Sequence, residues 1–169
     1  EECGVELGAD VPGRMLPYLD SKDAQLRRAA ARSLAEAVGS HTSTLDDILS
    51  KLREKYFELA KPKKQLLDEF GMPKKMDLSD PWEARHGIAT AFKELSPFLS
   101  KEQLDSLFDF MIANGPLSDK SESVRGGMLE AANRAIEIHG KGLVEELMGK
   151  FESTLESTGK GNTETDLVN

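Results

Sequence analysis

Apolar residues recur along most of the chain at intervals of three and four positions, which places them on one face of an α-helix. The pattern is clearest after Thr44, where Asp46 and Asp47 bring negative charge to the positive end of the helix dipole. The apolar positions that follow share one face: Leu45, Ile48, Leu49, Leu52, Tyr56 and Leu59. We therefore predict an all-α fold.

The predicted helices follow one another in pairs. The pairs cover about 11–38, about 44–95 with an inserted loop at 61–80, about 101–139, and an incomplete pair at 142–169. About three and a half helix pairs with short connections are typical of a HEAT-repeat α-solenoid, the α-α superhelix in which each pair packs on its neighbours. We expect residues 1–169 to form a single segment of a longer solenoid.

Acidic and hydroxyl side chains precede most of the predicted helices. Asp20 is expected to cap a helix at 24–38, and Asp80, followed by Pro81, a helix that runs to about residue 95. Ser100 and Gln103 have the spacing of a capping box, in which each side chain accepts a hydrogen bond from the backbone N–H of the other residue. Asp119 is expected to cap a helix that ends near Ile138.

An arginine recurs near the start of the second helix in each of three pairs. The intervals between these arginines are 58 and 40 residues, and the second is close to the about 40–47 residues of a HEAT repeat. We expect the arginines to pair with acidic residues at the helix starts and to fix the register between repeats; the six residues are Arg27, Arg85, Arg125, Asp20, Asp80 and Asp119. The alternative is a ladder of arginines that binds a partner.

Several single positions and one further segment also carry predictions. Trp82 is expected to be buried, and Gly126 with Gly127 to allow close packing of helices. The face of their helix that we expect to be buried consists of Met128, Leu129, Ala132, Ala135 and Ile136. A further helix is predicted on Leu143, Val144, Leu147, Met148, Phe151 and Leu155, followed by a flexible loop at 157–163 and the start of another helix at 166–168.

Composition limits the classes of function. The formal net charge of −8 opposes general binding to nucleic-acid phosphates, so any such contact must be local. Cys3 is the only cysteine, which excludes an intramolecular disulfide and fits a reducing compartment. No apolar run is long enough to span a membrane, and we predict a cytoplasmic location.

The inserted loop carries the strongest candidate for a contact with a partner. Its lysines are Lys61, Lys63, Lys64, Lys74 and Lys75. The acidic residues between positions 61 and 75 are only Asp68 and Glu69. A basic loop in an acidic chain is suited to bind phosphate groups or an acidic protein. In the alternative interpretation, the apolar residues of the loop cover an edge of the repeat: Leu66, Leu67, Phe70 and Met72.

The remaining polar residues favour neither catalysis nor a bound cofactor. His41, His86 and His139 have no second histidine or carboxylate at the spacing of metal ligands, and no serine or cysteine lies in a nucleophile motif. We also find no glycine-rich phosphate loop. We therefore predict a binding scaffold that is not an enzyme, with no cofactor and no small-molecule substrate.

With this repeat register, three stretches resemble a known family: 19–38, 79–89 and 124–155. The most specific part is the pattern DPWEAR-x-GIA-x-AFK-x-L-x-P that begins at Asp80. The chain is similar to the central HEAT array of the giant translational activators of the general amino-acid control pathway. It resembles the part just before their segment similar to fungal elongation factor three.

The resemblance implies a place on ribosomes, through ribosomal protein or ribosomal RNA. It further implies an activator that senses stalled or collided ribosomes, works with an ATP-binding-cassette partner protein, and promotes activation of the kinase that phosphorylates initiation factor two alpha in amino-acid starvation. The kinase would bind another region. The alternative is a HEAT-type adaptor between proteins, such as a transport receptor or phosphatase scaffold, with no ribosome role; a third possibility is a purely structural spacer.

Overall fold

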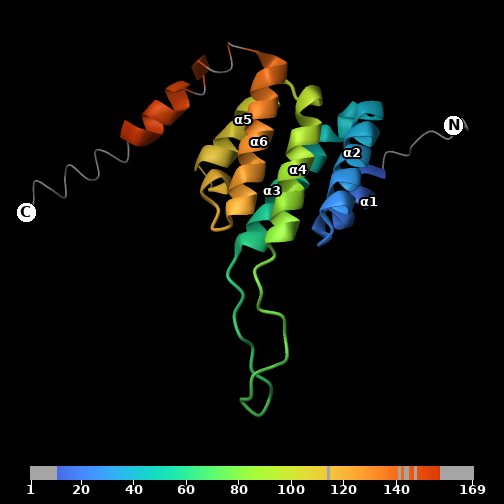
Figure 1. Cartoon of the computed structure of the whole chain (residues 1–169), viewed down its shortest axis with the longest axis vertical. Helices are drawn as coiled ribbons and strands as arrows, with labels where there is room; N and C mark the ends of the chain where they lie inside the picture. Colours follow the sequence, from blue (N-terminus) through green and yellow to red (C-terminus); the bar gives the residue numbers. More distant parts are fainter. Residues whose placement is uncertain (1–10, 114, 141, 143–144, 147, 157–169) are drawn as a thin grey trace, which may run out of the picture. The chain divides into compact units, whose positions relative to one another are not determined.

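The computed structural model describes residues 11–113, 115–140, 142, 145–146 and 148–156. Regular structure in these ranges is helical apart from one isolated β-bridge, which confirms the predicted all-α fold. The α-helices that Figure 1 labels are α1 Val11–Met15, α2 Ala24–Ser40, α3 Leu45–Ala60, α4 Trp82–Leu95, α5 Lys101–Ala113 and α6 Glu122–His139. No helix in these ranges is long and apolar enough to cross a membrane.

The chain forms two compact units that divide between Ala91 and Phe92, inside α4. The first unit contains α1 to α3 and most of α4, and its buried apolar residues include Leu19, Leu34, Ile48, Leu52 and Ile88. The second contains the end of α4 with α5 and α6, and buries Phe92, Leu95, Phe108, Met111 and Met128. In each unit the buried side chains follow the three-to-four spacing that predicted the helices.

Two of the predicted helix starts are observed where the sequence indicates them. Helix α3 begins at Leu45, directly after Thr44. At α5 the capping box is formed as predicted, because the Ser100 N–H donates to Gln103 Oε1 at 2.8 Å and the Gln103 N–H donates to Ser100 Oγ at 3.2 Å.

Asp20 does not cap α2, contrary to our prediction. The cap is Asp23, whose carboxylate accepts a hydrogen bond from the Gln25 N–H at 2.9 Å. The residues before it form a 3-10 helix, Leu16–Asp20, with a proline in its first turn, and α1 therefore ends at Met15 instead of near residue 19. Asp20 is left on the side of α3, where it forms an ion pair with Lys55.

The start of α6 also differs from the prediction. Its N-cap is Ser121, two residues after Asp119, because Asp119 uses its carboxylate to accept a hydrogen bond from the Ser121 N–H at 2.8 Å. On the predicted apolar face, Met128, Ala132 and Ala135 are buried, but Leu129 is exposed. The buried face is completed by Val124 and Ala131.

The glycine that permits close packing is Gly87 in α4, not Gly126 in α6. A Cβ atom on Gly87 would lie 1.9 Å from the Leu19 carbonyl oxygen, whereas a Cβ atom on Gly126 would meet nothing within 4 Å. Gly87 therefore allows the backbone of α4 to approach the 3-10 helix directly, and the prediction for Gly126 is wrong.

The predicted helix after α6 is only partly covered by the described residues, of which 148–156 are helical. Met148, Phe151 and Leu155 are exposed there. The side chains of Leu143, Val144 and Leu147, the predicted loop at 157–163, the predicted helix start at 166–168 and Cys3 lie outside the described residues. The division of the chain into HEAT pairs stays a prediction.

Candidate functional site

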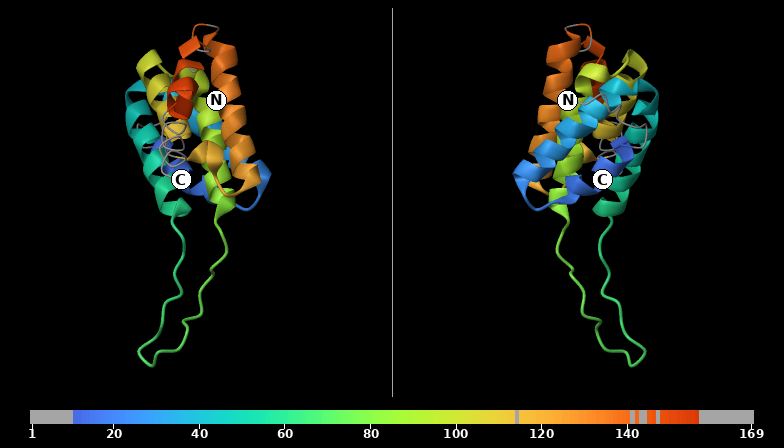
Figure 2. Two further views of the ribbon diagram at one scale, coloured as in Figure 1. Left: turned by 90° about the vertical axis from the view of Figure 1, so that its left-hand side faces the viewer. Right: turned by 90° about the vertical axis from the view of Figure 1, so that its right-hand side faces the viewer.

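The insertion between α3 and α4 is a narrow hairpin (Figures 1 and 2). Leu67 and Pro73 form an antiparallel β-bridge. On either side of it, the Lys74 N–H donates to the Leu66 carbonyl and the Asp68 N–H donates to the Met72 carbonyl, both at 2.8 Å. The segment of 61–80 thus has a defined backbone, although its prolines and adjacent leucines break the alternating pattern of a regular strand pair.

The tip of the hairpin is held by Asp68 and Gly71. One oxygen of the Asp68 carboxylate accepts hydrogen bonds from the backbone N–H groups of Phe70 and Met72, each at 2.9 Å. The Gly71 N–H donates to the Asp68 carbonyl at 3.0 Å, and Gly71 has a φ of 75°, a left-handed conformation that favours glycine. Three residues between paired positions with a left-handed glycine in the last one are typical of a tight hairpin loop.

Polar side chains also join the two arms of the hairpin. Lys63 Nζ donates to the Asp77 carbonyl at 3.1 Å, and the Gln65 side-chain amide donates to the Lys74 carbonyl at 2.9 Å. The Asp77 carboxylate accepts hydrogen bonds from the side chain and the backbone N–H of Ser79, and these bonds lower the pKa of Asp77. These contacts stabilise the arms over most of their length.

The base of the hairpin is closed by a single guanidinium group. Arg85 is completely buried and makes a bidentate ion pair with Asp80, with distances of 2.6 Å from Nη1 to Oδ1 and 2.8 Å from Nη2 to Oδ2. Arg85 Nη1 also donates to the Leu59 carbonyl at 3.3 Å. Since Leu59 precedes the insertion and Asp80 ends it, Arg85 holds the two ends of the hairpin together.

All five predicted lysines lie on this hairpin and are exposed: Lys61, Lys63, Lys64, Lys74 and Lys75. Lys61 pairs with Glu58 of α3 at 2.8 Å, and Lys63 bonds to the Asp77 carbonyl. Within the described ranges the ammonium groups of Lys64, Lys74 and Lys75 have no ion-pair partner. Most of the positive charge on the hairpin is therefore accessible to another molecule.

The apolar side chains of the hairpin are also exposed and do not cover an edge of the helical repeat. The exposed fractions are 82% for Phe70, 61% for Met72, 58% for Leu67 and 54% for Leu66. The alternative interpretation of the insertion as a cover over the helices is therefore wrong. The sequence contains these residues, but only the extended path of the backbone shows that they have no cover within the described structure.

The three repeated arginines are not equivalent. Arg27 is buried and Arg125 is exposed, and each donates through Nη1 to the carbonyl six residues before it, Ser21 at 2.8 Å and Asp119 at 2.6 Å. Arg85 instead pairs with the carboxylate that ends the hairpin. Because Arg27 and Arg85 are buried, the three do not form an open ladder; a role in the register between repeats stays a prediction.

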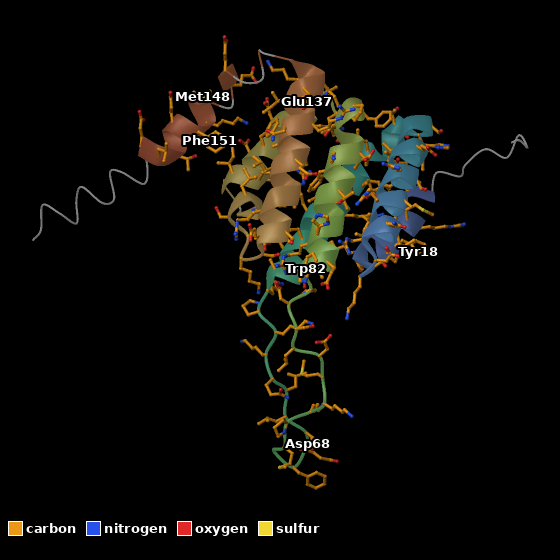
Figure 3. The ribbon with its side chains drawn as sticks, viewed as in Figure 1. Tyr18, Asp68, Trp82, Glu137, Met148 and Phe151 are labelled. Atoms are coloured by element: carbon orange, nitrogen blue, oxygen red, sulfur yellow. The ribbon has the colours of Figure 1, made fainter. Side chains whose placement is uncertain are left out.

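Trp82 lies at the start of α4 and is half-buried, where the sequence predicted a buried side chain (Figure 3). The Arg27 guanidinium lies 5.7 Å from the centre of the Trp82 ring, and the His86 ring meets the Trp82 ring edge-on with 6.4 Å between centroids. Burial lowers the pKa of Arg27, an effect opposed by the Glu83 and Asp23 carboxylates. The cluster joins α2 to α4 within the first unit.

The part of the chain that the structure describes contains no cluster suited to metal chemistry. No group of three or more histidine, cysteine, aspartate or glutamate side chains in it is placed to hold a metal ion. A cleft of 310 Å³ in the second unit is lined by Lys101, Leu104, His139, Gly142 and Glu146. Lys101 and Glu146 form an ion pair there at 3.1 Å, so these two charged groups of the cleft already have partners.

Comparison with known proteins gives consistent matches. The family model for the HEAT repeats of the stalled ribosome sensor GCN1 matches residues 1–169. Human "Stalled ribosome sensor GCN1" is 31% identical over 154 residues, 91% of this chain and 6% of the relative. The Saccharomyces cerevisiae "eIF-2-alpha kinase activator GCN1" is 32% identical over 85% of this chain and 6% of the relative.

A plant protein matches over nearly the whole chain. "Protein ILITYHIA" of Arabidopsis thaliana is 30% identical over 165 residues, 98% of this chain and 6% of the relative. The chain thus spans about a sixteenth of the length of these relatives, as the shares of 6% show. No solved structure matches the chain significantly.

Proposed function

This chain belongs to the HEAT-repeat family of the stalled ribosome sensor GCN1, and on that premise we propose that it is a scaffold segment of a ribosome-associated translational activator. The activator detects stalled or collided ribosomes and promotes activation of the kinase that phosphorylates initiation factor two alpha during amino-acid starvation. Support comes from the names of two relatives, "Stalled ribosome sensor" and "eIF-2-alpha kinase activator".

In this proposal the segment performs no catalysis and acts in the cytoplasm. The kinase binds to another region of the full-length protein, and an ATP-binding-cassette protein is a further partner. The helices of the segment hold binding surfaces at defined distances, since a stacked helical array is extended and each helix pair contacts only its neighbours. Several weak contacts along such an array combine into strong attachment to one large particle.

The hairpin at 61–80 is the feature that supports the proposal of a direct ribosome contact. It presents five lysines on an acidic chain, and it extends beyond the helix ends that Arg85 joins (Figure 2). Ammonium groups on a projecting arm can reach a partner while the acidic helices stay farther away. Salt screens the repulsion from the charges of these helices over about 10 Å. We propose that these lysines give the segment its attraction to the ribosome.

The test is co-sedimentation of the full-length protein with purified ribosomes over a series of salt concentrations. The test variant changes Lys61, Lys63, Lys64, Lys74 and Lys75 to glutamate. We expect weaker binding at low salt and a flatter dependence of affinity on salt, because ionic contacts are lost.

A matched control carries the same change of net charge at five lysines outside the hairpin: Lys22, Lys51, Lys93, Lys101 and Lys120. Its affinity should stay close to wild type. Equal affinity of wild type and the hairpin variant at every salt concentration would contradict a ribosome contact through these lysines, and the segment would then act as a spacer.

A further inference from the structure

Near its turn, the hairpin carries four large apolar side chains that are exposed and have no cover in the described structure. These four residues, which we call the apolar tip, are Leu66, Leu67, Phe70 and Met72. Figure 3 shows Asp68, which holds the turn, at the far end of the hairpin from Trp82. Exposed apolar patches on folded proteins mark contacts with another protein or with a ligand.

The apolar tip is held in place before any partner binds. The turn has four hydrogen bonds: the Phe70 and Met72 N–H groups donate to the Asp68 carboxylate, the Gly71 N–H donates to the Asp68 carbonyl, and the Asp68 N–H donates to the Met72 carbonyl. A segment with a fixed backbone loses less conformational entropy on binding than a flexible loop does. Phe70 in this setting is suited to act as an anchor in a pocket.

The charged residues near the apolar tip differ in sign between the turn and the two arms of the hairpin. The turn itself contains Asp68 and Glu69, while Lys63 and Lys64 precede the apolar tip and Lys74 and Lys75 follow it. Nucleic-acid phosphates would be repelled at the turn. Phe70 is moreover the only aromatic residue between 61 and 80, whereas binding to single-stranded nucleic acid usually stacks several successive bases on aromatic rings.

We propose that the apolar tip inserts into an apolar cleft on a protein whose rim carries carboxylates, which the flanking lysines contact. This inference rests on the proposed function and deepens it, since it assigns the ribosome contact of the hairpin to protein and not to RNA. The lysines orient the hairpin and raise the rate of association, and burial of Phe70 and Met72 supplies most of the affinity.

The experiment places the photoreactive amino acid p-benzoylphenylalanine at position 70 of the full-length protein bound to purified ribosomes. A second variant combines Phe70→Ser with Met72→Ser for affinity measurements. The controls are the photoreactive residue at position 129 and Leu129→Ser, because Leu129 in α6 is also exposed, with an exposed fraction of 54%. All substituted side chains are exposed, and circular dichroism melting verifies that each variant is folded.

We expect a cross-link from position 70 to a peptide of a ribosomal protein that contains acidic residues, and a loss of affinity of at least about tenfold for the double variant. A cross-link to ribosomal RNA would overturn the inference. Unchanged affinity of the double variant would also overturn the inference. If the lysine variant nevertheless binds more weakly than wild type, the proposed ribosome contact through the lysines stands without the apolar tip. If both variants bind like wild type, the proposed hairpin contact itself is overturned.

Discussion

Arg85 and Asp80 form an ion pair at the point where the hairpin returns to the helices. The Arg85 side chain is completely buried and that of Asp80 is about one-third exposed, with an exposed fraction of 31%. Two parallel hydrogen bonds and a third bond to the Leu59 carbonyl compensate for removing the guanidinium from water. The pair therefore joins three chain segments: the end of α3, the end of the hairpin and the start of α4.

Asp80→Ala should lower the free energy of unfolding by about 3 kcal/mol, because the buried Arg85 charge would lose its partner. Urea denaturation followed by circular dichroism measures the effect. Asp47→Ala is the control, since the Asp47–Lys51 ion pair is largely exposed and its loss should cost less than about 1 kcal/mol. Equal effects of the two substitutions would contradict this account of the Arg85 site.

Gly87→Ala should destabilise the chain by about 2 kcal/mol or more, since a Cβ atom would overlap the Leu19 carbonyl and force α4 away from the 3-10 helix. Thermal unfolding of this variant is compared with that of Gly126→Ala. Gly126 has free space around it, so alanine there should stabilise α6 by about 0.5–1 kcal/mol. The two substitutions are chemically identical, and opposite signs are the expected result.

Asp68→Ala should loosen the tip without unfolding the helices. The amides of Phe70 and Met72 would lose their acceptor, and their hydrogen exchange should become about fivefold faster, as expected for a hydrogen bond of about 1 kcal/mol. The midpoint of global urea unfolding should stay near that of wild type. Glu69→Ala, at the neighbouring exposed position, is the control and should leave both amides unchanged.

The carboxyl group of Asp77 should titrate below the ordinary aspartate pKa of about 3.9, because Ser79 hydrogen-bonds to its ionised form. A depressed pKa stabilises the hairpin base at pH values above the ordinary pKa, and this contribution is lost as the pH falls through the folded-state pKa. NMR titration of the Asp77 side chain measures it. Ser79→Ala should raise the pKa, whereas Ser118→Ala should not change it.

Helix positions and most of the buried faces followed from local information. The spacing of Leu45, Ile48 and Leu52 and the reciprocal caps of Ser100 and Gln103 depend on residues within a few positions of one another. The position of Asp20 could not be predicted in this way. Its carboxylate pairs with Lys55, more than thirty residues away, and local capping propensity does not indicate such a contact.

The two proposed contact features of the hairpin, its lysines and its apolar tip, also differ in how far the sequence predicts them. The lysine excess was visible as a count of charges, and Asp68 with Gly71 is a turn signal from which the hairpin could have been predicted. The exposure of Phe70 was not predictable, because an apolar residue in a loop is as compatible with packing on a helix as with projection from it. The need for glycine at position 87 likewise depends on a distant backbone carbonyl.

Arg85 closes the hairpin at its base, so the contact between α3 and α4 there does not require a particular hairpin length. Since Arg85 joins Leu59 in the last turn of α3 to Asp80 just before α4, we expect residues added or removed between these two positions to leave α3 and α4 in place. Doubling a flexible loop costs only about 0.6 kcal/mol in closure entropy. A longer or shorter arm should therefore change the reach of the hairpin at little expense in stability, and a fluorescent reporter can be grafted there.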